Sequence, residues 1–92
     1  MQSHIQNWKI ENDFLTKEFS FESFSKAMEF VNEIAPVAEK TDHHPDILVH
    51  SYNKVEIFLR THSSDAITDK DYNMAEHIDD LVAMTVLVGK LR

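Results

Sequence analysis

Three of the six histidines stand at two places in the chain, His43-His44 and His62, where the sequence predicts the ends of structural elements. The imidazole group gains and loses a proton near neutral pH, with an unperturbed pKa of about 6.5. Two adjacent histidines and a third brought near by folding provide what a proton-transfer site or a metal site requires. The spacing therefore indicates a site of one of these two kinds.

Proton transfer is the interpretation we favour over metal binding. Three imidazoles can hold a catalytic zinc ion. However, the neighbouring side chains of His43 and His44 diverge unless the backbone turns between them. We therefore expect no metal at these histidines.

The composition limits the class of protein. A chain of 92 residues has room for one domain, residues 1–92, with a thin core. The net charge of −7 disfavours direct binding to nucleic acid, which relies on clustered lysine and arginine. There is no cysteine, so disulfides and thiolate metal sites are excluded. The N-terminus has no signal-peptide pattern, and no apolar run approaches a membrane span, so we expect a cytoplasmic protein that does not enter a membrane.

Six elements are predicted to position the histidines. Strands are expected at 5–10 and 14–19, joined by a turn at 11–13, and again at 46–50 and 54–62, joined by a turn at 51–53. The last strand places on one face the residues that should meet the helices, namely Val55, Ile57, Leu59 and Thr61. The other face is more polar and carries Lys54, Glu56, Phe58, Arg60 and, at the strand's end, His62.

The first helix is the clearest segment, because apolar residues recur at helical spacing. Ser20 or Ser23 can cap its start, Lys40 suits its end, and Pro36 predicts a kink or an early change of course. The apolar positions are Phe24, Ala27, Met28, Val31, Ile34, Ala35 and Ala38.

A second helix is expected after Thr68, its cap, with Asp69 and Asp71 in the first turn and Gly89 as a stop signal. Its apolar face comprises Tyr72, Ala75, Ile78 and Val82, with Leu81 beside them. The element order predicts an α+β fold of two layers, in which both helices cover one face of a four-stranded antiparallel sheet.

Four ordered motifs resemble the pterin-4a-carbinolamine dehydratase family: Glu39-Lys40-x-x-His43-His44-Pro45-Asp46, Ser51-Tyr52-Asn53-Lys54-Val55, Leu59-x-Thr61-His62 and Thr68-x-x-Asp71-x-x-x-Ala75. Upstream, Trp8 and the pattern Phe19-x-Phe21-x-x-Phe24-x-x-Ala27 are similar to that family too. The resemblance extends from about Trp8 to Val82. It departs from the family at Ile47, where tryptophan is frequent, at Ala66, where glycine is frequent, and by one extra residue between Pro45 and Tyr52.

The resemblance implies a sheet with helices on one side, assembled as a homodimer or homotetramer. It implies loss of water from a 4a-hydroxytetrahydropterin, in the recycling of the hydroxylase cofactor, without a metal or organic cofactor. The implied catalytic residues are His43, His44, His62 and Asp71. The implied pterin-binding residues are His43, His44, Pro45, Thr61, His62, Ser63 and Ser64.

Chemically, this reaction needs an acid to protonate the departing hydroxyl and a base to take the ring N–H proton. Histidines typically contribute about 10²–10⁴-fold by such transfers. We expect His44 and His62 to carry most of the proton transfer, while His43 chiefly binds pterin. The carboxylate of Asp71 would orient one ring or accept from the N–H edge of the pterin.

Simpler structural roles remain as alternatives. His43 and His44 can be helix-end residues, His62 a solvated strand end, and Asp71 a first-turn helix residue. We interpret His4, His50 and His77 as ordinary surface or partly buried residues, and Glu39 as a surface or supporting charge. Among the aromatic residues, we interpret Trp8 as a core or interface residue, and Phe21, Phe24 and Phe30 as core residues.

A non-enzymatic dimerisation or assembly module is the alternative from another functional class, since relatives of the resembled family use the fold in that way. Either function is compatible with self-association, because the sheet has edges that need cover. The apolar segment at 84–88, near the end of the last helix, offers a second surface for it.

Overall fold

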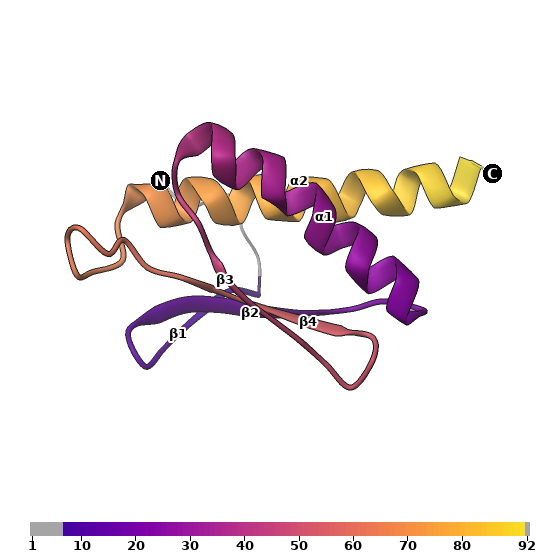
Figure 1. Ribbon diagram of the computed structural model, residues 1–92, viewed down its shortest axis with the longest axis horizontal. Coiled ribbons are helices and arrows are strands. Elements are labelled where there is room, and N and C mark those ends of the chain that lie inside the picture. The colour runs from indigo at the N-terminus through magenta and orange to yellow at the C-terminus, as the bar shows by residue number, and fades with distance from the viewer. Residues whose placement is uncertain (1–6, 92) are drawn as a thin grey trace.

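The protein folds into two layers, with two helices lying on one face of an antiparallel sheet (Figure 1). The structure is a computed structural model that describes the backbone of residues 7–91 and the side chains of residues 7–84. The elements in chain order are β1 (Lys9–Glu11), β2 (Phe14–Ser20), α1 (Phe24–Thr41), β3 (Asp46–His50), β4 (Lys54–Leu59) and α2 (Asp69–Leu91). The predicted α+β fold is confirmed.

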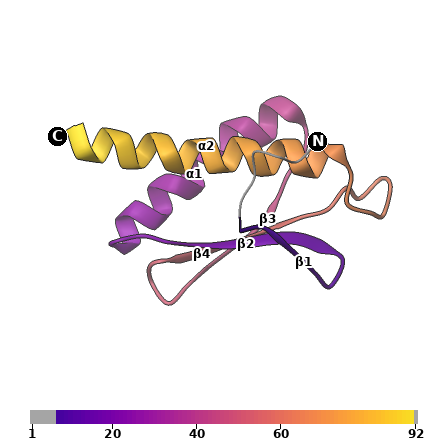
Figure 2. The same ribbon diagram turned by 180° about the vertical axis from the view of Figure 1, so that it is seen from behind.

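The four strands are arranged in the order β1-β2-β4-β3, and each neighbouring pair is antiparallel. Two hairpins therefore lie side by side, with the longest ladder between β2 and β4, where Leu15 pairs with Leu59. The reverse view also places both helices on the same side, so the other face of the sheet is left uncovered by them (Figure 2). β1 and β3 form the edges.

The first hairpin is tighter than predicted. Strand β1 covers residues 9–11 and not 5–10, because Glu11 still pairs with Phe14 and the turn is limited to Asn12 and Asp13. Both turn residues have positive φ, 53° and 68°, which matches the twist of a two-residue hairpin turn. Residues 5 and 6 of the predicted strand lie outside the described residues, as does His4.

Strand β4 is also shorter than predicted and ends at Leu59, not at residue 62. Beyond it, Thr61 forms an isolated bridge with Ala66, to which it donates its N–H over 2.9 Å. The chain therefore turns back on itself at residues 62–65. The predicted inward face is nevertheless confirmed, because Val55, Ile57, Leu59 and Thr61 are all buried.

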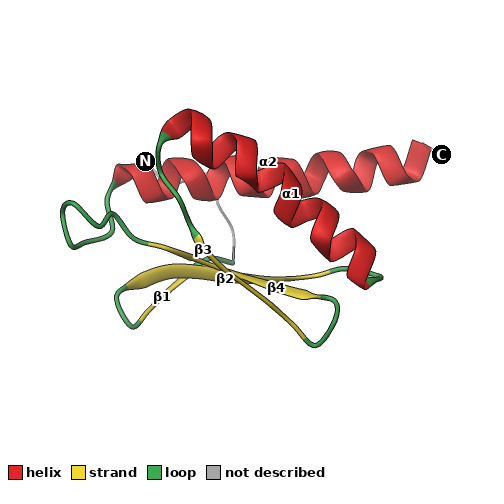
Figure 3. Ribbon diagram, in the orientation of Figure 1, coloured by secondary structure: helices red, strands yellow, loops and turns green. Residues whose placement is uncertain are grey.

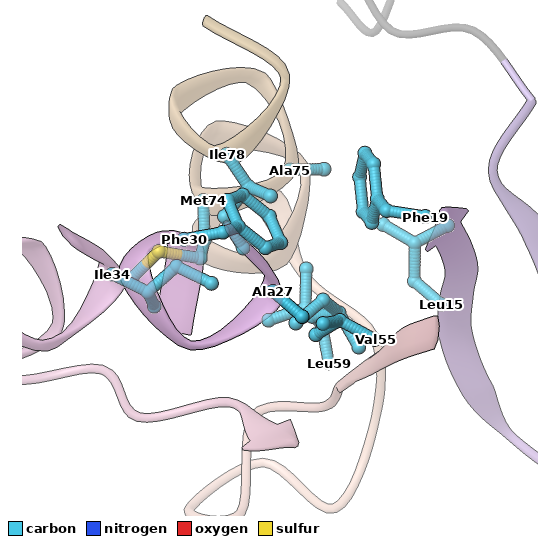
Figure 4. Packing of buried hydrophobic residues seen from close by; sticks show 11 residues of the cluster. Leu15, Phe19, Ala27, Phe30, Ile34, Val55, Leu59, Met74, Ala75 and Ile78 are labelled. Carbon is cyan, nitrogen blue, oxygen red and sulfur yellow. The ribbon is translucent and has the colours of Figure 1, made fainter. Parts of the chain in front are cut away.

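The hydrophobic core fills the space between the layers. Figure 4 shows side chains from both helices meeting those of β2 and β4 there. Phe30 lies at its centre, with its ring centroid 5.1 Å from that of Phe19 and 5.0 Å from that of Phe21. The buried cluster comprises Leu15, Phe19, Ala27, Phe30, Ile34, Val55, Ile57, Leu59, Met74, Ala75 and Ile78.

Phe24 does not belong to this core, contrary to the sequence prediction. It is the first residue of α1 and is 56% exposed, because the first turn extends past the edge of the buried stripe. Ala35 is exposed as well, so the buried face is narrower than the apolar spacing indicated, and it is completed by Phe30.

The predicted stop at Gly89 is wrong. Of the two outcomes predicted at Pro36, the early change of course is wrong, and the kink stays a prediction. Pro36 lies inside α1, which continues to Thr41, and Gly89 lies inside α2, which continues to Leu91. Proline removes one backbone hydrogen bond, and neighbouring turns packed on the sheet sustain the helix across that gap. None of the described helices is both long enough and apolar enough to cross a membrane.

Polar contacts fix α2 on the sheet. Asp79 on α2 accepts hydrogen bonds from the indole Nε1 of Trp8 at 3.0 Å and from Nζ of Lys17 at 2.8 Å. Trp8 also packs edge-on against Phe19, with ring centroids 6.1 Å apart. Trp8 is therefore part of the support for the helix layer, in agreement with its predicted core role.

Candidate active site

The segment that carries His43 and His44 is positioned by the end of α1. Asp42 adopts the left-handed conformation (φ 53°, ψ 40°), which reverses the direction of the chain. Its N–H is directed to Glu39 O, and the N–H of His43 donates to Ala38 O over 3.2 Å. This pair of bonds is a Schellman ending, with aspartate at the position that glycine usually occupies. It directs the loop back toward the start of α2.

The predicted loops converge at one end of the molecule. Figure 3 shows the loops that follow α1 and β4 lying beside the first turn of α2. This arrangement brings together His43 after α1, Thr61 after β4 and Asp71 in α2, which the sequence separates widely.

Asp71 is the buried centre of this arrangement, with no exposed surface. Its Oδ2 accepts the backbone N–H of Thr68 at 2.9 Å, and Thr68 Oγ1 accepts the N–H of Lys70 at 3.3 Å. These bonds cap the start of α2 in a variant of the capping box, in which the Thr68 hydroxyl accepts from the second helical residue and the Asp71 carboxylate accepts from the N-cap N–H. The carboxylate also lies at the positive end of the helix dipole. Thr68 thus caps α2 as the sequence predicted.

A second buried hydroxyl holds the same carboxylate. Thr61 Oγ1 donates to Asp71 Oδ2 at 2.8 Å and lies 2.6 Å from Thr68 Oγ1. Because the Thr61 hydroxyl has one proton, Thr68 must be the donor in the second bond. Thr61 is 4% exposed, so its hydroxyl supports Asp71 from the protein side. Within residues 7–84, every buried polar side-chain atom has such a partner.

The other oxygen of Asp71 faces His43. Asp71 Oδ1 lies 2.6 Å from His43 Nε2, and the His43 side chain is 12% exposed. A carboxylate at this distance accepts the ring N–H, so the neutral ring has its proton on Nε2 and presents Nδ1 as an acceptor. The buried carboxylate thereby fixes both the orientation and the tautomer of this histidine.

His44 and His62 are differently placed. His44 Nε2 lies 2.8 Å from Glu39 Oε2, and both side chains are largely exposed. His62 is exposed in the turn at 62–65, together with Ser63 and Ser64, and its backbone carbonyl accepts from the N–H of Asp65. Both imidazoles are therefore open to solvent.

A cavity of about 340 Å³ opens beside His43, between the end of α1 and the outer face of α2. Small-molecule clefts typically enclose about 300–1,000 Å³. The described residues that line it do not include His44 or His62. They are Thr41, His43, Lys70, Asn73, Met74, Glu76, His77 and Asp80.

Sequence reasoning missed the contribution of α2 to this cavity. Lys70, Asn73, His77 and Asp80 recur at intervals of three and four residues, and this spacing places them on one side of the helix. That polar stripe is a usable signal, which the interpretation of His77 as an ordinary surface or partly buried residue did not include. Met74, whose side chain is almost fully buried, forms the apolar floor.

This arrangement can bind a small polar molecule and exchange protons with it. His43 presents an oriented ring to the cavity, and His77 adds a second imidazole. Among the described residues, the metal-ligating side chains that do converge are Glu18, His50 and Glu56, which are not members of the predicted site. That the three predicted histidines bind no metal stays a prediction.

Comparisons with known proteins match this chain to one family. The family model described as Pterin 4 alpha carbinolamine dehydratase matches residues 1–81. A protein of Metallosphaera sedula, provisionally named a pterin-4-alpha-carbinolamine dehydratase, is 42% identical over 80 residues, covering 87% of this chain and 82% of its own length. A similarly named protein of Prochlorococcus marinus is 46% identical over 76 residues, covering 83% of this chain and 79% of its own.

Two solved structures are similar as well. The crystal structure of a transcriptional coactivator/pterin dehydratase from Brucella melitensis has a TM-score of 0.78 at 34% identity, covering 84% of this chain and 83% of that one. A pterin dehydratase-like protein, identified as a RuBisCO assembly factor in the alpha-carboxysome, has a TM-score of 0.70 at 25% identity, covering 85% of this chain and 92% of that one.

Proposed function

The chain belongs to the pterin 4 alpha carbinolamine dehydratase family, and from this premise we propose that it is a hydro-lyase acting in tetrahydropterin recycling. Its substrate is a 4a-hydroxytetrahydropterin, and its products are a quinonoid dihydropterin and water. The observation that carries the proposal is the contact between His43 and the buried carboxylate of Asp71, at the edge of a cavity of about 340 Å³.

The reaction is a balanced pair of proton transfers. An acid donates a proton to the 4a-hydroxyl, and the C–O bond breaks to release water. A base takes the proton from the ring N–H, and that electron pair forms the new C=N bond. One proton is given and one is taken, so the protein returns to its starting state once its histidines re-equilibrate with solvent.

The roles we propose rest on two different supports. Geometry supports His43 as a pterin-binding residue, oriented by Asp71 and backed by Thr61. The family motifs support His44 and His62 as the groups that transfer protons. The exposure of both rings suits this role, because each can exchange protons with water between turnovers. Pro45, Ser63 and Ser64 complete the proposed binding segments.

A dehydration assay tests the proposal directly. A chemically generated 4a-hydroxytetrahydropterin loses its absorbance as it dehydrates. The purified chain should accelerate this decay in proportion to its concentration. Decay at the buffer rate across the whole concentration range would overturn the proposal.

A non-enzymatic assembly role is the second candidate. It is favoured by the similarity to the structure identified as a RuBisCO assembly factor, which covers 85% of this chain. Such a protein would use the fold as a docking module. It would bind a protein partner without accelerating dehydration, so the same assay separates the two functions.

We also propose a cytoplasmic homodimer or homotetramer that uses neither a metal nor an organic cofactor for this reaction. The support for self-association lies in the sheet, where β1 and β3 are edge strands. Exposed strand edges invite pairing with another chain. On β3, Leu48 is also 47% exposed, which adds apolar surface near such a contact.

A further inference from the structure

A second group of side chains, which could bind a metal ion, lies on the sheet face that turns away from the helices. Three adjacent strands contribute to it, with Glu18 on β2, Glu56 on β4 and His50 on β3. His50 Nε2 lies 2.7 Å from Glu18 Oε1. Each residue offers one ligand atom, and these three atoms all lie within 4.8 Å of one another. The group therefore has the compactness of an ion-binding site.

The pairing register makes this group electrostatically unusual. Glu18 is the direct cross-strand partner of Glu56. Like charges at directly opposed positions destabilise a sheet, so this pair needs a positive charge beside it. The nearest cationic neighbour along β4 is Lys54, whose ammonium group donates to Ser20 Oγ at 3.0 Å. That ammonium group is bonded to a hydroxyl, whereas the imidazole of His50 contacts Glu18 directly.

Groups outside the trio orient two of its members. The second ring nitrogen of His50, Nδ1, lies 3.1 Å from Ser51 Oγ, which leaves Nε2 to face the carboxylates. Thr16 Oγ1 donates to Glu56 Oε2 at 3.3 Å, and Thr16 is only 1% exposed. Metal-binding histidines usually engage their other ring nitrogen in this way, and ligating carboxylates are likewise hydrogen-bonded.

We propose that Glu18, His50 and Glu56 bind one Zn²⁺ ion on this face, separately from the His43–Asp71 site. One imidazole nitrogen and two carboxylate oxygens suit zinc, with water in the fourth position. Magnesium and calcium prefer sites made wholly of oxygen. Ligands about 2.0–2.2 Å from zinc at a tetrahedral angle lie about 3.3–3.6 Å from each other. Glu18 and His50 must therefore separate slightly, and their partly exposed side chains have room to do so.

Calorimetric titration of the metal-stripped protein with ZnCl₂ tests the site. We expect saturable binding of one ion per chain, and no comparable heat from MgCl₂. His50→Gln should abolish this binding, and Glu56→Gln should weaken it at least about tenfold. In parallel, NMR of the histidine rings should show the His50 resonances shifting with zinc occupancy.

Matched variants test whether other histidines or acidic residues are the zinc ligands. His77→Gln removes an imidazole from the cavity on α2, and Glu22→Gln removes an exposed carboxylate elsewhere, so both should bind zinc as the parent does. Far-UV circular dichroism checks that each variant is folded. The proposal is overturned if no saturable binding occurs, or if His77→Gln rather than His50→Gln removes it. Neither readout depends on dehydratase activity, so failure here is distinguishable from failure of the proposed function.

Discussion

His43 Nε2 and Asp71 Oδ1 lie 2.6 Å apart, although 28 residues separate them in the chain. The contact joins the loop after α1 to the first turn of α2, and it buries the carboxylate completely. Because Asp71 also accepts from Thr61 and Thr68, its position is fixed from three directions. The orientation of His43 is therefore set by the contact between the ending of α1 and the start of α2.

Asp71→Asn should damage both stability and turnover. The amide presents an N–H₂ group where the carboxylate accepted hydrogen bonds, so at least one buried donor loses its partner. We expect the free energy of unfolding to fall by about 1–3 kcal/mol, measured by urea denaturation, and turnover to fall with the loss of the fixed tautomer of His43. Asp69→Asn, the same change at an exposed position two residues earlier, is the control and should alter neither quantity appreciably.

His44→Ala and His62→Ala should each lower turnover by about 10²-fold or more, because each removes a proposed acid or base. Their stabilities should change little, since both side chains are exposed. His50→Ala, on the uncovered face of the sheet, is the matched control and should retain parental turnover. Near-normal turnover in both variants would show that the proton-transfer roles are wrongly assigned.

Chelator treatment should leave dehydration unchanged, because the proposed mechanism needs protons and no metal. The measurement compares initial rates before and after prolonged exposure to a strong chelator. Loss of the zinc proposed at Glu18, His50 and Glu56 should not affect the rate, because that group lies on the sheet face turned away from the helices. A rate that disappears with chelation and returns with added zinc would contradict the mechanism.

Phe30→Ala should destabilise the protein by about 3–5 kcal/mol, the usual cost of deleting a fully buried aromatic ring. Phe30 is 1% exposed and contacts the rings of Phe19 and Phe21. The control is Phe24→Ala on the same helix, which should change stability by no more than about 0.5 kcal/mol because that ring is exposed. Similar losses in urea denaturation for the two variants would mean that Phe24 is covered in solution.

Light scattering at micromolar concentration should give the mass of a dimer or a tetramer of the 10.7 kDa chain. The sheet edges at β1 and β3 supply unpaired backbone groups for this association. Leu48→Lys, in the edge strand β3, places a charge at an exposed apolar position and should shift the distribution toward the monomer. A mass near 10.7 kDa for the parent protein would contradict the predicted homodimer or homotetramer.

The predicted helix surface at 84–88 extends beyond the described side chains, although Met84 itself is 62% exposed.

The sequence alone determined the two-layer α+β fold and the inward face of β4. Those predictions succeeded because alternation and helical spacing are set by local geometry, so Val55, Ile57 and Leu59 had only one way to be buried together. Element ends were less predictable. Apolar spacing placed Phe24 in the core and Gly89 signalled a helix stop, yet Phe24 is exposed and α2 continues to Leu91.

The candidate site divides in the same way. Its histidines were proposed from their type and placement, and Asp71 from the family resemblance of the motifs around it. Which histidine meets Asp71 was decided by tertiary structure, because the answer depends on Asp42 reversing the chain after α1 and on the start of α2 lying beside it. The cavity lined by His77, and the meeting of Glu18, His50 and Glu56 across three strands, likewise follow from packing and strand register, which no local pattern specifies.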